Sequence, residues 1–448
     1  MTSYNNNNQD EVGIVAIQVY FPKTYVDQAD LEKFEGVAAG KFTKGLGQER
    51  MSFVNDREDI YSICLTVVQS LMESYNISYN DIGRLEVGTE TIIDHSKSVK
   101  SVLMQLFCDN SDVEGIDTVH ACYGGTNALL NACAWIQSSA WDGRYALVVA
   151  ADIAEYASGP ARPTGGVGAV AMLIGQGASI VLDAPRATHM EHAYDFYKPN
   201  LSSPYPVVDG HFSNICYLKS LDTCYKLYKN KVSKIVPDFH IERDADFTVF
   251  HAPYNKLVQK SFARLIYNDF LSNPDHSRYD SIRDEALALD QNDDRKVNDV
   301  FAKFAADDYA RKAGPSTLLP RQIGNMYTAS LYAGLASLIF NAADELPGKR
   351  IVMFSYGSGL ASSMFSFHIP EHRSDKIQEM KQALNLRQRL DSRHRQEPAV
   401  LEQTLACRDK LHTVQSFTPA GPLDWLFSGT YYLIDKDAKS RRFYERHH

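Results

Sequence analysis

The amino-acid sequence predicts an α/β fold made of two similar halves, in which helices lie between sheets rich in parallel strands. One order of elements occurs twice: an apolar strand, a helix of small residues, and a second apolar strand. These elements fall at residues 85–87, 126–136 and 145–150, and again at 247–250, 328–340 and 351–354. The two series therefore predict a duplicated architecture.

Spacing and composition support the duplication. Cys122 precedes Gly143 by 21 positions, and Asn325 precedes Gly348 by 23. Both helices consist mainly of small and apolar residues without a polar face, which predicts that each is buried on all sides. All-apolar strands are typical of sheets that are covered on both faces. Coincidence between two common strand-turn-helix units carries less weight, because the repeated positions also hold the candidate catalytic residues.

Four segments lie outside the repeat. Residues 189–219, rich in Tyr, Pro, Ser and Asp, predict a loop too long to be a simple connection. The charged, helix-prone residues 274–312 predict a solvated helical hairpin. Residues 373–411 predict a further pair of amphipathic helices, and residues 431–434 a strand near the end of the chain.

The expected organisation follows from these segments. Residues 1–12 contain an Asn run and are predicted to be disordered. A first half is expected over 13–230. A second half is expected over 231–448, with the helical insertion near 275–312, and with the C-terminal helices and strand at its end.

Composition excludes several classes of protein. The 448 residues are 44% hydrophobic and 23% charged, as in a soluble globular protein. A net charge of −9 offers no basic stripe for nucleic acid. No stretch reaches the ~18 apolar residues of a membrane span, and the N-terminus lacks the features of a signal or transit peptide. We therefore expect a cytoplasmic protein that binds neither nucleic acid nor membrane.

The seven cysteines occur at irregular spacings without a CxxC pair, which argues against a disulfide framework and against a zinc site. Cys122 differs from the other six. It precedes Tyr-Gly-Gly-Thr at the predicted start of a buried helix, where the helix dipole would lower the thiol pKa. The glycines permit close approach of a substrate. A small buried cysteine is the usual case, but this flank favours a nucleophile.

Two further residues lie at equivalent ends of repeated strands. Glu90 follows the strand near 87, and His251 follows the strand over 247–250. A buried Glu90 would suit a general base, although it could simply cap the next segment. A lone His at a strand end is more often structural. Lys256 and Lys260 follow at a spacing that places them on one helix face. This pair of lysines could bind an anionic substrate, or it could simply be part of a solvated charged surface.

The chain contains the motifs 56–60 (DREDI), 88–91 (GTET), 121–126 (ACYGGT), 159–166 (GPARPTGG), 194–199 (YDFYKP), 253–261 (PYNKLVQKS) and 324–327 (GNMY). Together these motifs resemble the 3-hydroxy-3-methylglutaryl-CoA synthase family of condensing enzymes, in its eukaryotic cytosolic form. The matches extend from about Gly13 to Tyr444, nearly the whole chain.

The resemblance implies a thiolase-like five-layer αβαβα fold and a homodimer. It implies that acetyl-CoA and acetoacetyl-CoA condense through an acetyl-Cys122 intermediate, for isoprenoid and sterol precursor synthesis, without a metal or an organic cofactor. Cys122 matches the acetylated nucleophile, Glu90 the general acid/base, and His251 the residue that orients acetoacetyl-CoA. The implied substrate-binding and site-supporting residues are Asn325, Ser358, Tyr327, Asp152, Asp195, Thr164, Lys256 and Lys260.

Some residues depart from the family pattern. His120 stands where a small or amide residue is more usual, Asn127 lies just inside the helix, and Ala151 precedes Asp152 in place of Gly. None of these changes removes a catalytic group. Four alternatives remain: a β-branching synthase fed by a carrier protein, a simpler ketoacyl synthase, a Cys/His hydrolase, and a non-catalytic acyl-CoA-binding relative. Glu90 argues against the simpler ketoacyl synthase, which would have His and Asn beside the cysteine.

Overall fold

The structure is a computed structural model that describes residues 11–290 and 293–448. Its centre is a nine-stranded mixed sheet with the strand order β11-β12-β13-β8-β1-β7-β6-β4-β5. Strands β1 and β8 are joined by only two residue pairs, Gly13 with Val181 and Ile14 with Ile180. The sheet therefore consists of two half-sheets that meet at a narrow junction.

Each half-sheet combines parallel and antiparallel pairs. The first contains β1 (Gly13–Tyr20), β4 (Ile82–Gly88), β5 (Asp117–Thr118), β6 (Tyr145–Ala154) and β7 (Gly166–Gly175). The second contains β8 (Ile180–Met190), β11 (Phe247–Phe250), β12 (Arg350–Gly357) and β13 (Ala361–His368). In the first, β4 runs parallel to β6 and β6 antiparallel to β7. In the second, β11 runs parallel to β12 and β12 antiparallel to β13. This correspondence confirms the duplication.

The second copy of the repeat begins earlier than expected. Strand β8 pairs with β13 as β1 pairs with β7, and α5 (Gly210–Val232) follows β8 as α2 (Ile60–Ser74) follows β1. Residues 180–230 thus lie with the second half-sheet, whereas the expected division at 230/231 assigned them to the first half. The apolar repeat in the sequence begins only at 247–250, so it gave no sign of the earlier strand.

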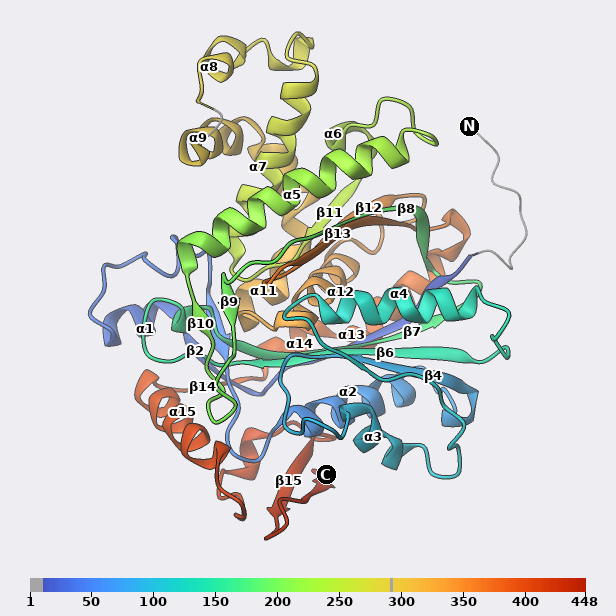
Figure 1. Cartoon of the computed structure of the whole chain (residues 1–448), viewed down its shortest axis with the longest axis vertical. Coiled ribbons are helices and arrows are strands. Elements are labelled where there is room, and N and C mark those ends of the chain that lie inside the picture. The colour runs from blue at the N-terminus through green and yellow to red at the C-terminus, as the bar shows by residue number, and fades with distance from the viewer. Residues whose placement is uncertain (1–10, 291–292) are drawn as a thin grey trace.

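Five layers are visible in Figure 1. Helices α2 and α3 (Val99–Leu103) cover the outer face of the first half-sheet, and α5 and α7 (Asn255–Ser272) cover the outer face of the second. Helices α4 (Gly124–Ile136) and α12 (Ser330–Ala342) lie between the two half-sheets and share one apolar core with strands of both. This is the predicted αβαβα arrangement.

The two central helices differ in burial. Helix α12 is buried along nearly its whole length, as predicted. Helix α4 leaves Ala134 exposed and Asn127, Leu130 and Asn131 partly exposed. The prediction that both helices are buried on all sides is therefore wrong for α4. One side of α4 is not covered by the rest of the chain, and its apolar composition gives no indication of this.

Two non-repeated segments contain more regular structure than expected. The predicted loop over 189–219 is shorter, because α5 begins at Gly210; the preceding stretch forms a small hairpin of β9 (Phe196–Tyr197) and β10 (Val207–Val208). The insertion contains α8 (Arg283–Leu287), α9 (Asp294–Phe304) and α10 (Ala306–Lys312). Val297 and Phe301 of α9 are buried in the core around α7, so the insertion is helical but not a purely solvated hairpin.

The C-terminal segment covers the first half. It forms α13 (Ser374–Leu384), α14 (Leu386–Asp391) and α15 (Pro398–His412), one helix more than predicted, followed by the hairpin of β15 (Tyr431–Lys436) and β16 (Arg442–Arg446). The remaining short elements are β2 (Thr24–Asp27), α1 (Gln28–Phe34), β3 (Arg50–Ser52), α6 (Ile241–Asp244), α11 (Leu318–Ile323) and β14 (His394–Arg395). Residues 1–12 are predicted to be disordered, and the first ten of them lie outside the described part of the chain. Among described residues, none of the helices combines the length and apolarity needed to cross a bilayer.

Candidate active site

Cys122 lies just ahead of the first central helix. Strand β5 ends at Thr118, Ala121 has a positive φ of 38°, and α4 begins at Gly124 with Tyr123 as its N-cap residue. Cys122 therefore lies one residue before the N-cap, close to the predicted start of the helix. Gly125 lets the helix start pack tightly, because a Cβ there would lie 2.8 Å from the Cβ of Ala150 on β6.

Glu90 faces the thiol from the loop that follows β4. Its Oε2 lies 3.9 Å from Sγ of Cys122, and its Oε1 lies 2.7 Å from Nζ of Lys198. Lys198 comes from the segment between β9 and β10, and its Nζ also lies 4.7 Å from the centre of the Tyr327 ring. The carboxylate is thus held between a thiol on one side and a cation on the other.

Burial controls the ionisation of both groups. It raises the pKa of Glu90 to about 7, against the opposing effect of Lys198. Burial, together with the carboxylates of Glu90 and Asp152, raises the pKa of the Cys122 thiol well above its usual range. The expectation that the helix dipole would lower this pKa is wrong. Because little free thiolate exists, the thiol needs a nearby base during attack, and Glu90 is within reach.

The ion pair predicts how activity depends on pH. A general base works as carboxylate, so turnover should rise with pH between about 6 and 8, with a midpoint near the Glu90 pKa of about 7. Lys198→Met removes the cation that lowers this pKa, so the midpoint should move to higher pH. Measuring kcat against pH tests this. Lys219→Met, which breaks an exposed pair with Glu191, should leave the profile unchanged; equal profiles for Lys198→Met and the unsubstituted chain would refute the role of Lys198.

Asp152 joins the two halves beneath the site. The residue is fully buried near the end of β6, which extends beyond the predicted 145–150 to Ala154. Its Oδ1 accepts hydrogen bonds from the backbone and hydroxyl groups of the 89–91 loop, at 2.8–2.9 Å. Its Oδ2 accepts from the backbone N–H of Thr328 at 2.9 Å and from its hydroxyl at 2.6 Å. Asp152 therefore fixes the backbone of Glu90.

His251 follows β11 in the second half, where Glu90 follows β4 in the first. Its side chain is 1% exposed, and burial lowers its pKa to about 3, so the imidazole is neutral. Tyr217 donates to its backbone oxygen at 2.8 Å. Within the described part of the chain, neither ring nitrogen has a hydrogen-bond partner. Burying an imidazole without a hydrogen-bond partner costs free energy. A ligand that supplies the missing partner would remove this cost.

Contacts at the end of β12 bring the second half to Cys122. A Cβ on Gly357 would lie 2.5 Å from the backbone nitrogen of Tyr123, so β12 ends against the segment that carries the thiol. Ser358 follows directly. Asp195 is fully buried beside this turn and accepts from the Tyr356 hydroxyl and the Gly359 backbone N–H, each at 2.9 Å. Asp195 thus holds the turn in place.

Asn325 and Tyr327 precede the second central helix. The amide oxygen of Asn325 accepts from the backbone of Tyr327 and from Ser330, each at 2.9 Å. Its backbone N–H donates to the carbonyl of Thr164 at 3.0 Å. Tyr327 packs in one small apolar cluster with Tyr156, and Cys122 packs against that cluster. The structure therefore brings Asn325, Tyr327 and Thr164 together near the thiol.

Lys256 and Lys260 lie on α7, which begins four residues after His251. Lys256 donates from Nζ to Gln259 at 2.5 Å, and its backbone N–H donates to Leu46 at 2.7 Å. The structure places both lysines on the His251 side of the site without direct contact to Cys122 or Glu90.

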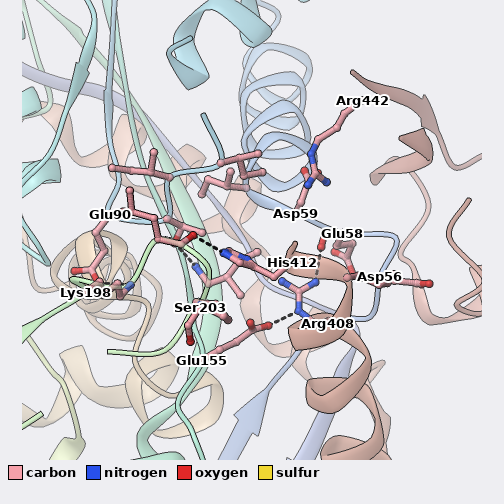
Figure 2. A pocket seen from close by; sticks show the side chains of 18 of the residues that line it. Asp56, Glu58, Asp59, Glu90, Glu155, Lys198, Ser203, Arg408, His412 and Arg442 are labelled. Atoms are coloured by element: carbon pink, nitrogen blue, oxygen red, sulfur yellow. Dashed lines mark hydrogen bonds and ion pairs between the residues drawn. The ribbon is translucent and has the colours of Figure 1, made fainter. Parts of the chain in front are cut away.

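Lys198 is the residue that sequence reasoning missed. It belongs to the motif at 194–199, but a lysine in a loop carries no local sign of a partner more than a hundred residues away. Only the pairing with Glu90 reveals its role. Figure 2 shows Lys198 beside Glu90 at the edge of a polar cavity.

Comparison with known proteins agrees with this geometry. Residues 8–179 match the family "Hydroxymethylglutaryl-coenzyme A synthase N terminal", and residues 180–447 match "Hydroxymethylglutaryl-coenzyme A synthase C terminal". The boundary between the two coincides with the start of β8. A cytoplasmic hydroxymethylglutaryl-CoA synthase of Homo sapiens is 51% identical, covering 97% of this chain and 87% of the relative. The hydroxymethylglutaryl-CoA synthase of Saccharomyces cerevisiae is 50% identical, covering 99% and 92%.

Solved structures share the fold. MvaS in complex with 3-hydroxy-3-methylglutaryl coenzyme A has a TM-score of 0.86 and 30% identity, covering 98% of this chain and 99% of that one. A hydroxymethylglutaryl-CoA synthase complexed with CoA has a TM-score of 0.77 at 22% identity, covering 97% and 100%. These likenesses confirm the predicted thiolase-like fold, and several relatives named cytoplasmic agree with the expected location. The chain belongs to the hydroxymethylglutaryl-coenzyme A synthase family, and it is an enzyme of that family.

Proposed function

We propose that this chain condenses acetyl-CoA with acetoacetyl-CoA and water to 3-hydroxy-3-methylglutaryl-CoA, through an acetyl group carried on Cys122. The observation that carries the proposal is the arrangement of Glu90, whose carboxylate lies 3.9 Å from the thiol and is paired with Lys198 on its other oxygen. A thiol and a buried base of pKa about 7 are the groups that acyl transfer followed by carbanion formation requires.

Acetylation is the first step. The thiol of Cys122 attacks the carbonyl of acetyl-CoA while its proton passes to Glu90, and the thiolate of CoA leaves and is protonated. The backbone N–H of Cys122 and the N–H groups at the start of α4 supply donors for the oxyanion that forms during the attack.

Condensation follows. Sulfur donates to a carbonyl less than an ester oxygen does, so the methyl protons of acetyl-Cys122 are acidic enough for Glu90 to remove one. The resulting enolate attacks the C3 ketone of acetoacetyl-CoA. The proton that Glu90 holds then passes to the C3 alkoxide, which becomes the hydroxyl group of the product and leaves Glu90 as a carboxylate. His251 is neutral and donates an N–H to the ketone oxygen, and Asn325 supports the same oxygen. Acid–base catalysis of this kind contributes roughly 10²–10⁴-fold.

Hydrolysis of the thioester on Cys122 releases the product. Every step uses a thiol, a carboxylate, an imidazole or an amide of this chain, so we propose that the reaction needs no metal and no organic cofactor. Lys256 and Lys260 lie on one face of α7 on the His251 side, which suits the phosphates of the acyl-CoA.

We further propose a homodimer, and a role in the mevalonate route to isoprenoid and sterol precursors. Strand β5 forms an outer edge of the sheet, and Ile116 and Val119 beside it are 60% and 53% exposed. An uncovered edge flanked by apolar residues is a natural place for a second copy to pack.

The direct test of the function is an absorbance assay that follows consumption of acetoacetyl-CoA. Consumption should require acetyl-CoA, and mass spectrometry should identify hydroxymethylglutaryl-CoA as the product. Binding without turnover would indicate a non-catalytic relative. Turnover only with acetoacetyl groups on a carrier protein would indicate the β-branching alternative. A solved synthase in complex with a carrier protein shares the fold of this chain at 22% identity.

The role of His251 predicts a separation of two kinetic constants. His251→Ala should raise the KM for acetoacetyl-CoA by roughly ten- to a hundredfold, the loss expected for one buried hydrogen bond of ~1–3 kcal/mol. The rate of Cys122 acetylation should stay the same. His251→Gln keeps an N–H donor and should lose less. If acetoacetyl-CoA kinetics do not change, His251 is structural.

A further inference from the structure

A cavity of about 350 Å³ has Glu90 in its wall, and of the described residues neither Lys256 nor Lys260 borders it. It lies between the loop after β4, the segment 198–204 and the C-terminal helix α15 (Figure 2). Glu90, Thr91 and Lys198 form its inner end. Of the described residues, neither Cys122 nor His251 lines the cavity. The cavity therefore borders the carboxylate of Glu90 and not the thiol.

The walls of the cavity combine charged side chains with apolar ones such as Ile153, Leu201 and Phe417. Arg408 forms an ion pair with Glu155, and Arg442 pairs with Asp59 at 2.9 Å. The other charged or titratable lining residues are Asp56, Glu58, His95, His412 and Lys436. About 10–15 Å³ with two or more polar partners is enough to hold one water molecule. The cavity is therefore large and polar enough to hold several.

The outer end of the cavity opens to solvent. Leu201 is 69% exposed, and His412 is also exposed; both line the cavity. The cavity thus connects the surface with Glu90 and carries charged side chains along part of its wall.

We propose that this cavity is the route by which water reaches Glu90 to hydrolyse the acyl thioester on Cys122. The proposal rests on the function proposed above. In the hydrolytic step, Glu90 takes a proton from a water molecule while the water oxygen attacks the thioester carbonyl. The carbon–sulfur bond then breaks, the sulfur of Cys122 takes a proton, and the product leaves as a carboxylate. One net proton is released, and the same cavity gives it a path to solvent.

A separate route is needed because of the chemistry of the intermediate. After condensation the acyl group is bonded to Cys122 at one end and to CoA at the other. The CoA chain then still fills the passage through which the acyl-CoA came. Water that attacks at this stage must approach by another path, and of the described residues neither Lys256 nor Lys260 borders the cavity.

Two wall positions test the route, each with an exposed neighbour as its control. Ser203 lines the cavity beside Lys198 (Figure 2), and Ser202 next to it is exposed and does not line it. Leu411 lines the cavity from α15, and Lys410 next to it is exposed and does not line it. We compare Ser203→Trp with Ser202→Trp, and Leu411→Trp with Lys410→Trp.

The measurement is quenched-flow mass spectrometry of the Cys122 peptide during turnover. In the wall variants, Cys122 should be acetylated at the unchanged rate. Hydrolysis should be about tenfold slower, which corresponds to a barrier higher by ~1.4 kcal/mol, and the hydroxymethylglutaryl adduct should therefore accumulate. The control variants should not accumulate it. If Ser203→Trp does not fold by thermal melting, Leu411→Trp carries the comparison alone.

Two results would overturn the route. Wall and control variants that hydrolyse equally fast would show that water arrives elsewhere. Wall variants whose acetylation slows as much as their hydrolysis would show that the cavity admits acyl-CoA. Absence of any acyl group on Cys122 in the unsubstituted chain is a different result, because it removes the proposed function itself.

Discussion

Cys122→Ala should abolish both turnover and the covalent acetyl group. The expected loss is on the order of 10⁶-fold, comparable to removal of a nucleophile in hydrolases, because no other group in the site can carry the acyl chain. Tyr123 and the start of α4 keep their backbone positions in this variant, so acyl-CoA binding should survive. Turnover is measured by the acetoacetyl-CoA absorbance assay, and binding by calorimetry with CoA.

A second cysteine provides the control for this variant. Cys407 is exposed on α15 and, of the described residues, is not among those that line the cavity at Glu90, so Cys407→Ala should retain full activity. Turnover by Cys122→Ala within about a hundredfold of the unsubstituted chain would mean that acyl transfer proceeds directly between the two CoA esters. That result would remove the covalent intermediate from the mechanism.

Glu90→Gln should lower turnover by roughly 10²–10⁴-fold, the usual contribution of a general base. The amide keeps the shape of the side chain and loses only the ability to accept a proton. Acetylation should become slower, since the thiol has a raised pKa and loses its base, yet the acetyl group should still form given time. Single-turnover mass spectrometry separates acetylation from condensation.

Exchange of the methyl protons gives a second measurement on the same variant. The unsubstituted chain should exchange deuterium into acetyl-Cys122 in heavy water, and Glu90→Gln should not. Glu155→Gln is the matched control, because Glu155 also lines the polar cavity but pairs with Arg408. A variant Glu90→Gln that exchanges at the normal rate would assign the carbanion-forming step to another base.

The repeated elements could be predicted because buried strands and helices have a recognisable apolar composition in the local sequence. The strand over 247–250 agrees with β11, and the apolar helices agree with α4 and α12 to within two residues. Apolar strands covered on both faces and helices without a polar side leave few other packing solutions. The candidate residues Cys122, Glu90 and His251 stood at the ends of these elements, so their rough neighbourhood followed from the topology.

The remaining features depend on contacts that no local pattern encodes. Strand β8 alternates buried and exposed residues along its second part and does not resemble the other repeated strands, so the start of the second half was missed. The sign of the Cys122 pKa shift depends on two buried carboxylates, Glu90 and Asp152, that approach from other strands. Lys198 became part of the site only through its ion pair with Glu90.

Incubation of the chain with acetyl-CoA alone, followed by digestion and mass spectrometry, is the most direct test of the covalent acetyl-Cys122 intermediate. One acetyl group should appear, on the peptide that contains Cys122, and addition of acetoacetyl-CoA should remove it as hydroxymethylglutaryl-CoA forms. An acetyl group on any other residue, or product formation with Cys122 never acetylated, would contradict the account.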